Sequence, residues 1–246
     1  MAARTSSIPL YSEIARESFS KLAGLEPRIK TLRDNLAQLE SPNDMAQLEL
    51  KYEIMLLEIE AAKLASVTIV FTTISAEAYI YDYAARHLSD SYVKNYLDRL
   101  DPISKWVIIP RLVTGKELKH GGKWFQLLKD LIRDRNSVIH SKSFQLPSPS
   151  NREGTQKYFE KLEEDHHQMI EKARKAMELL DTLVAEIGAL DPEEAIWAEN
   201  YLSKPFQPWR KNEFSNDYHC RKPWARPGNA LYPIRASRNQ FFCCGQ

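Results

Sequence analysis

The sequence predicts an all-α fold: a helical bundle with one very long helix, followed by an irregular C-terminal extension. Apolar residues recur every three or four positions over most of the first 190 residues, which is the period of an α-helix. Glycine, proline and small polar residues separate these periodic segments. Residues 67–74 are rich in β-branched side chains, but no turn residues bound them and the helical period continues through them.

Four helices are predicted in the first 100 residues. Residues 10–23 and 25–39 form the first two, and Ser41-Pro42-Asn43 ends the second. Residues 45–88 form one very long helix, or two with a bend, and residues 90–100 form a short one. The apolar face expected for the long helix consists of Leu48, Tyr52, Met55, Ile59, Ala62, Ile69, Thr73, Ala76, Ile80 and Tyr83.

Three further helices are predicted before residue 190. Asp101-Pro102 has the pattern of a helix N-cap followed by proline at the first helical position, and this helix ends near Gly115. Gly121-Gly122 separates it from a helix whose apolar residues begin at Trp124. A loop rich in proline and serine precedes a long charged helix over residues 156–188.

The composition changes after Asp191-Pro192, so residues 1–190 are expected to form one domain and residues 191–246 an extension. Residues 201–246 combine proline and aromatic residues with eight Lys or Arg and two acids. Such a segment can stack on unpaired bases of a nucleic acid. It can equally be an arm that packs on its own domain or on a second subunit, and composition favours this second interpretation.

The most informative stretch is Arg135-Asn136-Ser137-Val138-Ile139-His140, at the end of the helix that begins near Trp124. Arginine carries a permanent charge that suits phosphate, and histidine moves protons near neutral pH. Asparagine can orient either of them through hydrogen bonds. These are the side chains that metal-free cleavage of RNA needs. A histidine at a helix C-terminus is also a common stabilising feature, so a purely structural role stays open.

This Arg-Asn-x-x-x-His motif resembles the signature of HEPN domains (higher eukaryote and prokaryote nucleotide-binding domains). Arg133 also fits the spacing of that signature, although the adjacent Asn136 favours Arg135. Residues 71–80, which contain Glu77, are similar to the acid-bearing long helix of many members. The resemblance covers residues 45–190 in organisation and these two short stretches in residues.

Glu77 interrupts an apolar face of the long helix, and Arg135 interrupts the apolar face of its own helix. An unpaired buried carboxylate is costly, so an ion pair between Glu77 and Arg135 is expected. Such a pair would also aim the guanidinium group of Arg135. The alternative is that the motif is a polar network without catalytic function.

Charge and cysteine content narrow the class of protein. Residues 110–142 hold eight Lys or Arg and three acids, which suits a polyanion or a solvated helix surface. The three cysteines, Cys220, Cys243 and Cys244, lie outside the helical part, which favours a reducing compartment. With no apolar leader recognisable and only a short apolar run at residues 64–74, a cytoplasmic protein is expected. The terminal Cys243-Cys244-Gly245-Gln246 lacks the aliphatic residues of a prenylation signal.

No metal or cofactor is expected. The candidate metal ligands are confined to one charged helix surface, where adjacent histidines point to different sides. They are Glu163, Asp165, His166, His167 and Glu171. The pattern therefore indicates a solvated face in preference to a metal site.

The HEPN resemblance implies a metal-independent endoribonuclease that cleaves RNA by attack of a ribose 2′-hydroxyl. Its catalytic residues would be Arg135, Asn136 and His140, with Glu77 and Arg133 supporting them. It implies a homodimer through the motif helix, a role as a toxin or in anti-phage defence, and an antitoxin or nucleotidyltransferase partner. The alternative is a non-catalytic helical module that binds a nucleotide or a partner protein.

Overall fold

The computed structural model describes residues 6–39, 45–119, 121–140, 148 and 151–203, without the side chains of residues 152 and 159. All of them belong to one compact unit, Met1–Phe206, which is separate from Gln207–Gln246. Every regular element within these described ranges is helical. The prediction of an all-α fold is therefore confirmed.

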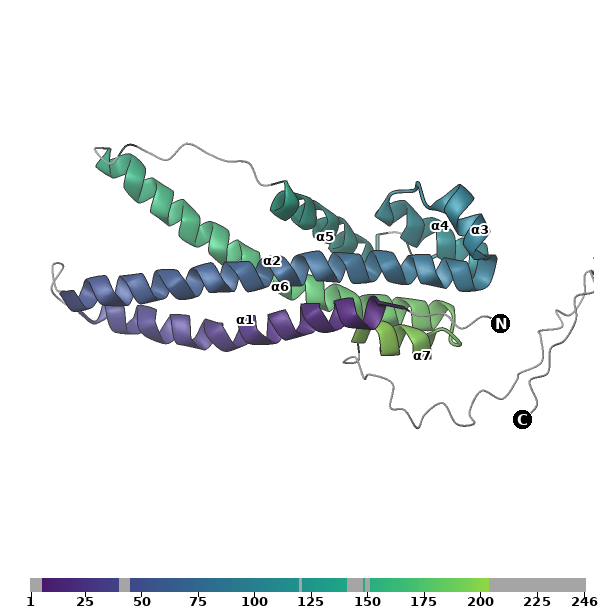
Figure 1. Ribbon diagram of the computed structural model, residues 1–246, viewed down its shortest axis with the longest axis horizontal. Helices are drawn as coiled ribbons and strands as arrows, with labels where there is room; N and C mark the ends of the chain where they lie inside the picture. Colours follow the sequence, from purple (N-terminus) through teal and green to yellow (C-terminus); the bar gives the residue numbers. More distant parts are fainter. Residues whose placement is uncertain (1–5, 40–44, 120, 141–147, 149–150, 204–246) are drawn as a thin grey trace, which may run out of the picture. The chain divides into compact units, whose positions relative to one another are not determined.

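Helices α1 (Ile8–Ala37) and α2 (Met45–Leu88) form a long antiparallel hairpin (Figure 1). The prediction of two separate helices before residue 40 is wrong, because α1 continues through Pro27. A proline inside a helix costs about 3 kcal/mol because one hydrogen bond is lost. Burial of Leu22 and Ile29, which flank this position, favours the continuous helix despite that cost.

Helix α2 is the single long helix that the sequence predicted, but its N-terminal half buries a different face. Ile69, Ala76, Ile80 and Tyr83 of the C-terminal half are buried, as expected. In the N-terminal half, the buried residues are Ile54, Glu58, Ala61 and Ala65. The expected residues are instead exposed: Leu48, Tyr52, Met55 and Ile59. This half of α2 is apolar on two sides, and α1 covers the side that carries Ile54, Glu58 and Ala61.

The short helices after α2 begin where the sequence predicted, but the helical segment predicted over residues 90–100 ends at Leu97. α3 (Asp90–Tyr92) leads into a π-helical turn, η1 (Val93–Leu97), and then into α4 (Pro102–Thr114). The Asp101 carboxylate caps α4 by accepting a hydrogen bond of 3.0 Å from the backbone N–H of Ser104. Gly115 ends α4 with a φ of 74°, a backbone conformation that favours glycine.

The Asp101 cap gives a first test of the fold. Hydrogen bonds from the hydroxyl and the backbone of Ser104 lower the pKa of Asp101, so the carboxylate is charged and capping at neutral pH. We expect Asp101→Ala to lower the free energy of unfolding by about 1 kcal/mol, measured by urea denaturation. Asp101→Asn keeps an oxygen acceptor and should lose much less. Equal losses in the two variants would contradict a capping role.

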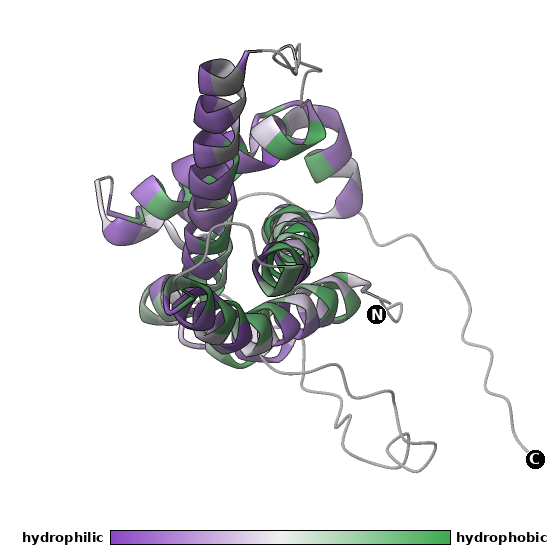
Figure 2. Cartoon of the chain, turned by 90° about the vertical axis from the view of Figure 1, so that its left-hand side faces the viewer, coloured by the Kyte–Doolittle hydropathy of each residue, from purple (hydrophilic) through white to green (hydrophobic). Residues whose placement is uncertain are grey.

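Helices α5 (Lys123–Ile139) and α6 (Arg152–Leu190) complete the core around the C-terminal half of α2. α5 buries Trp124, Leu128 and Leu131, as its apolar period predicted. α6 buries Ala173, Ala176, Leu180, Leu183 and Ile187. The N-terminal half of α6 is mostly hydrophilic and rises away from the α1–α2 hairpin (Figure 2).

The helical unit extends beyond residue 190, where the sequence placed the domain boundary. α7 (Ala195–Ala198) and a π-helical turn, η2 (Glu199–Ser203), pack on the bundle. The Ser12 hydroxyl donates to the carbonyl of Tyr201 at 2.8 Å, and Arg16 donates to the carbonyl of Leu202. Residues 204–246, the basic aromatic part of the extension, lie outside the described residues.

None of the described helices has an apolar stretch that is long enough to cross a lipid bilayer.

Candidate functional site

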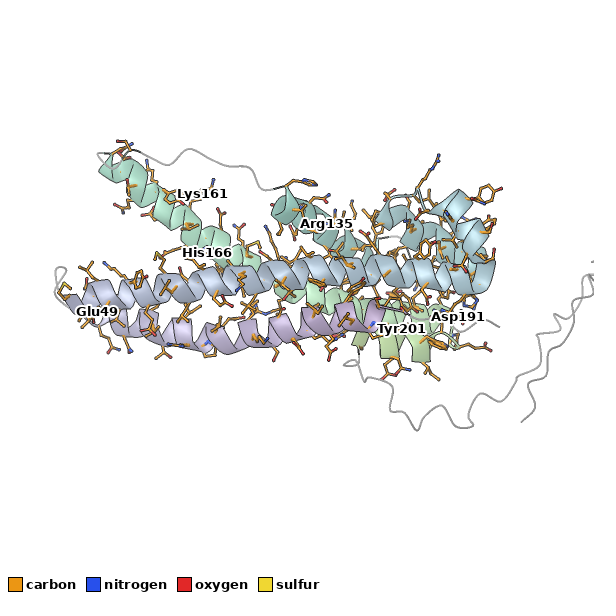
Figure 3. All side chains as sticks on the ribbon, viewed as in Figure 1. Glu49, Arg135, Lys161, His166, Asp191 and Tyr201 are labelled. Carbon is orange, nitrogen blue, oxygen red and sulfur yellow. The ribbon has the colours of Figure 1, made fainter. Side chains whose placement is uncertain are left out.

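The Arg-Asn-x-x-x-His motif occupies the last turns of α5. Arg135 follows Leu128 and Leu131 on the side of α5 that faces the core, so its side chain is half-buried. Asn136 and His140 are exposed. The helix therefore places a half-buried arginine, labelled in Figure 3, next to two solvent-accessible polar side chains.

Arg135 and Asn136 are held together by a direct hydrogen bond. Nη1 of Arg135 donates to Oδ1 of Asn136 at 3.0 Å. The two N–H groups of the Asn136 side-chain amide take no part in this hydrogen bond. Nε of Arg135 is shielded from solvent and finds no hydrogen-bond partner among the described residues. The guanidinium group also forms no ion pair within that part of the chain.

The expected ion pair between Glu77 and Arg135 is not formed, and that prediction is wrong. Glu77 is half-buried on α2, and no ion pair joins it to Arg135 in the described part of the protein. The sequence period places an acid on one side of a helix, but it does not fix which neighbouring helix covers that side.

Asp134 is the acid that α5 buries, and the sequence analysis did not single it out. It is 6% exposed. Nε of Arg133 lies 3.6 Å from its carboxylate, and Nζ of Lys172 on α6 lies 3.8 Å away. These charges link α5 to α6. The sequence contained an indication of this burial, because Asp134 lies three residues after the buried Leu131 and therefore on the same side of the helix.

Arg133, the second candidate arginine, is engaged on the surface. Its guanidinium group lies 2.9 Å from the Asp130 carboxylate, and its side chain is 69% exposed. Arg135 has no such counter-charge among the described residues. This difference favours Arg135 as the functional arginine of the motif.

His140 is the C-cap residue of α5. Its backbone N–H donates to the carbonyl of Asn136 at 2.9 Å, which fixes the position of the residue at the helix end. No hydrogen bond within the described ranges joins its imidazole to the side chains of Arg135 or Asn136. The helix thus brings Arg135 and Asn136 together, and it leaves the imidazole of His140 accessible one turn further on.

The positive charge around α5 is partly neutralised. Arg111 pairs with Glu117 at 2.6 Å, and Lys123 pairs with Glu178. Nζ of Lys129 lies 5.5 Å from the centre of the Phe125 ring, within the range of a cation–π contact. The net charge of this segment therefore overstates the positive field that a ligand would meet.

His166 turns away from the surface cluster that the sequence raised as a metal candidate. Its Nδ1 lies 3.7 Å from the Glu58 carboxylate, which also binds Arg33 at 2.6 Å. This network connects α1, α2 and α6. The described residues contain no group of three or more His, Cys, Asp or Glu arranged to hold a metal ion.

A second polar cluster, centred on Glu194, was missed by the sequence analysis. Glu194 is 2% exposed and accepts two hydrogen bonds from the guanidinium group of Arg86. The hydroxyl of Tyr79 donates to the same carboxylate at 2.7 Å. Arg86 also donates to Asp82 at 2.8 Å. The cluster therefore fastens the chain before α7 to the C-terminal part of α2.

Ionisation in this cluster follows from burial and pairing. Burial alone would raise the pKa of Glu194, but hydrogen bonds from Arg86, His87 and Tyr79 outweigh it and lower the pKa. Burial and the nearby Glu194 charge raise the pKa of Tyr79. Tyr83 donates to Asp191 at 3.0 Å beside the cluster, at the end of α6 marked by Asp191 in Figure 3. All of these polar groups satisfy one another, which indicates a structural role.

Comparison of the chain with protein-family models, curated proteins and solved structures finds no match. The likeness to HEPN domains therefore rests on the motif of α5 and on the acid-bearing stretch of α2.

Proposed function

We propose that this protein is a metal-independent endoribonuclease whose active residues are Arg135, Asn136 and His140. The observation that carries the proposal is the state of Arg135. Its Nε is shielded from solvent and its Nη1 is held by Asn136, yet the guanidinium group has no counter-charge among the described residues. A phosphate group of RNA would supply the missing anion, because arginine binds phosphate through two parallel hydrogen bonds.

The reaction follows from the chemistry of these groups. His140 accepts the proton of a ribose 2′-hydroxyl, whose oxygen then attacks the adjacent phosphorus. The bond from phosphorus to the 5′ oxygen breaks, and that oxygen takes a proton from water. Protonated His140 then gives its proton to the hydroxide that remains, which restores the neutral imidazole. Arg135 stabilises the charge that builds up on the phosphate oxygens, and Asn136 donates a hydrogen bond to one of them. The products are a 2′,3′-cyclic phosphate and a 5′-hydroxyl end.

The wider biological role follows from the resemblance alone. As in HEPN domains, the enzyme would be a homodimer, and it would act as a toxin or in defence against phage in the cytoplasm. An antitoxin or a nucleotidyltransferase would restrain it.

A non-catalytic helical module is the second candidate function. The observation that favours it is the absence of a hydrogen bond between the His140 imidazole and the other two motif side chains, all three of which are described. In such a module, the motif would bind a nucleotide phosphate without cleaving it.

Cleavage of RNA in the presence of EDTA separates these two functions. The purified protein should cut a single-stranded RNA and leave 2′,3′-cyclic phosphate ends, identified by mass spectrometry. The same sequence as DNA should remain intact, and so should an RNA with a 2′-deoxy substitution at the cleaved position, because both lack the nucleophile. Intact RNA, together with saturable binding of a nucleotide, would favour the module.

A further inference from the structure

We infer that a second copy of this chain binds the exposed apolar face of the N-terminal half of α2. We call this face the α2 seam, and its six large apolar side chains are each between 38% and 68% exposed. They are Met45, Leu48, Tyr52, Met55, Leu56 and Ile59. α1 covers the opposite side of the same helix at Ile54 and Ala61, so the α2 seam has no partner among the described residues.

The spacing of the α2 seam is that of a coiled coil. Met45, Leu48, Tyr52, Met55 and Ile59 follow one another at alternating steps of three and four residues. This spacing keeps one narrow stripe aligned with a partner helix, whereas a helix that is simply amphipathic has a broader apolar face. None of the five side chains is charged, so the stripe offers nothing to hold a polyanion. An uncharged apolar stripe on another helix is a suitable partner for the α2 seam. The α2 seam of a second copy is such a stripe.

An antiparallel arrangement matches the side chains by size. It places Leu48 against Ile59 of the partner subunit and Tyr52 against the partner's Met55. Met45, the most exposed residue of the α2 seam, then meets the partner's Ala62, which is small. The arrangement is self-complementary about a two-fold axis, as a closed homodimer requires.

The neighbouring helices also favour this direction. α5 lies over the C-terminal part of α2, and the N-terminal half of α6 rises near the other end (Figure 1). A parallel pair would bring two such α6 segments together at one end. An antiparallel pair of the first 18 residues of α2 keeps them apart and stops short of α5.

The size of the α2 seam predicts a weak dimer. The exposed side chains amount to at most about 600 Å² per copy, so two copies bury no more than roughly the 1,200 Å² at which specific interfaces begin. We therefore expect a dissociation constant in the micromolar range. This surface is separate from the motif helix, where Ile139 is the exposed large apolar residue of α5.

Sedimentation equilibrium from about 1 to 100 μM tests the inference, because this range brackets a weak dimer. Wild type should pass from monomer to dimer, and the double variant Leu48→Glu/Ile59→Glu should stay monomeric with unchanged helical content. Two controls alter apolar residues that are exposed elsewhere. Tyr96→Glu, after α3, and Ile139→Glu, at the end of α5, should both leave the dimer intact. A wild-type monomer throughout, or a dimer that only Ile139→Glu dissolves, would overturn the proposal.

Cross-linking tests the direction of the helices. In a background with Cys220, Cys243 and Cys244 replaced by serine, a mixture of Leu48→Cys and Ile59→Cys proteins should be joined by a short bismaleimide reagent. Each variant alone should remain largely uncoupled. Efficient coupling of Leu48→Cys to itself would mean that the helices are parallel, and it would reject the antiparallel arrangement. These outcomes do not depend on RNA cleavage, so the two proposals fail independently.

Discussion

His140→Ala and Arg135→Ala should each reduce RNA cleavage by at least about 10³-fold, because general base catalysis and charge stabilisation each contribute factors of this order. Both variants should keep the helical content of the wild type, since His140 is exposed and Arg135 lies at the edge of the core. The measurement is the initial rate of cleavage of a fluorescent single-stranded RNA, under EDTA, beside the circular dichroism spectrum of each variant.

Arg133→Ala is the matched control, because Arg133 lies two residues before Arg135 and is paired with Asp130 on the surface. It should retain most of the activity. Arg135→Lys separates charge from geometry: lysine keeps the charge but cannot form two parallel hydrogen bonds to phosphate, so only part of the activity should remain. Full activity in His140→Ala would reject the catalytic assignment.

The largest effect on stability is expected at the Glu194 cluster. Glu194→Ala leaves Arg86 enclosed without its main counter-charge and removes the acceptor for Tyr79. Breaking a buried ion pair from one side costs roughly 3–5 kcal/mol. Urea denaturation should report this loss, and Glu193→Ala, at the exposed neighbouring position, should change the free energy of unfolding very little.

The cluster also predicts how stability depends on pH. Because the pKa of Glu194 is lowered in the folded protein, its contribution is fully present above the ordinary pKa of a glutamate. That contribution is lost as the pH falls through the lowered value. The difference in stability between wild type and Glu194→Ala should therefore shrink in acid. A difference that stays constant from neutral pH to strongly acidic solution would contradict the assignment.

The order and ends of most helices were predictable from local rules. The Asp101 cap, the Gly115 stop and the continuous period of α2 are properties of a few neighbouring residues, so they can be read without knowing the fold. The break predicted near residue 24 was wrong, because the cost of Pro27 is local while the burial of α1 along α2 is not.

Which surfaces meet was much less predictable. The N-terminal half of α2 has two apolar sides, and a period identifies such sides without saying which one α1 covers. The same limit explains the candidate site. The sequence located the three motif residues at one helix end, but it predicted that Arg135 pairs with Glu77. That pair is not formed. The acid that α5 buries is Asp134, which lies near Lys172 of α6. Pairing across helices depends on tertiary packing, which one sequence does not reveal.

Helix α2 is continuous in its hydrogen bonds but not in its surroundings. Most residues between Thr68 and Ala85 are buried, whereas from Met45 to Leu57 only Ile54 is. Local opening costs least where few apolar contacts are broken, so backbone amides near Met45 should exchange with solvent long before those near Tyr79. We therefore expect the end of the α1–α2 hairpin to be a region of low local stability, attached to a buried core.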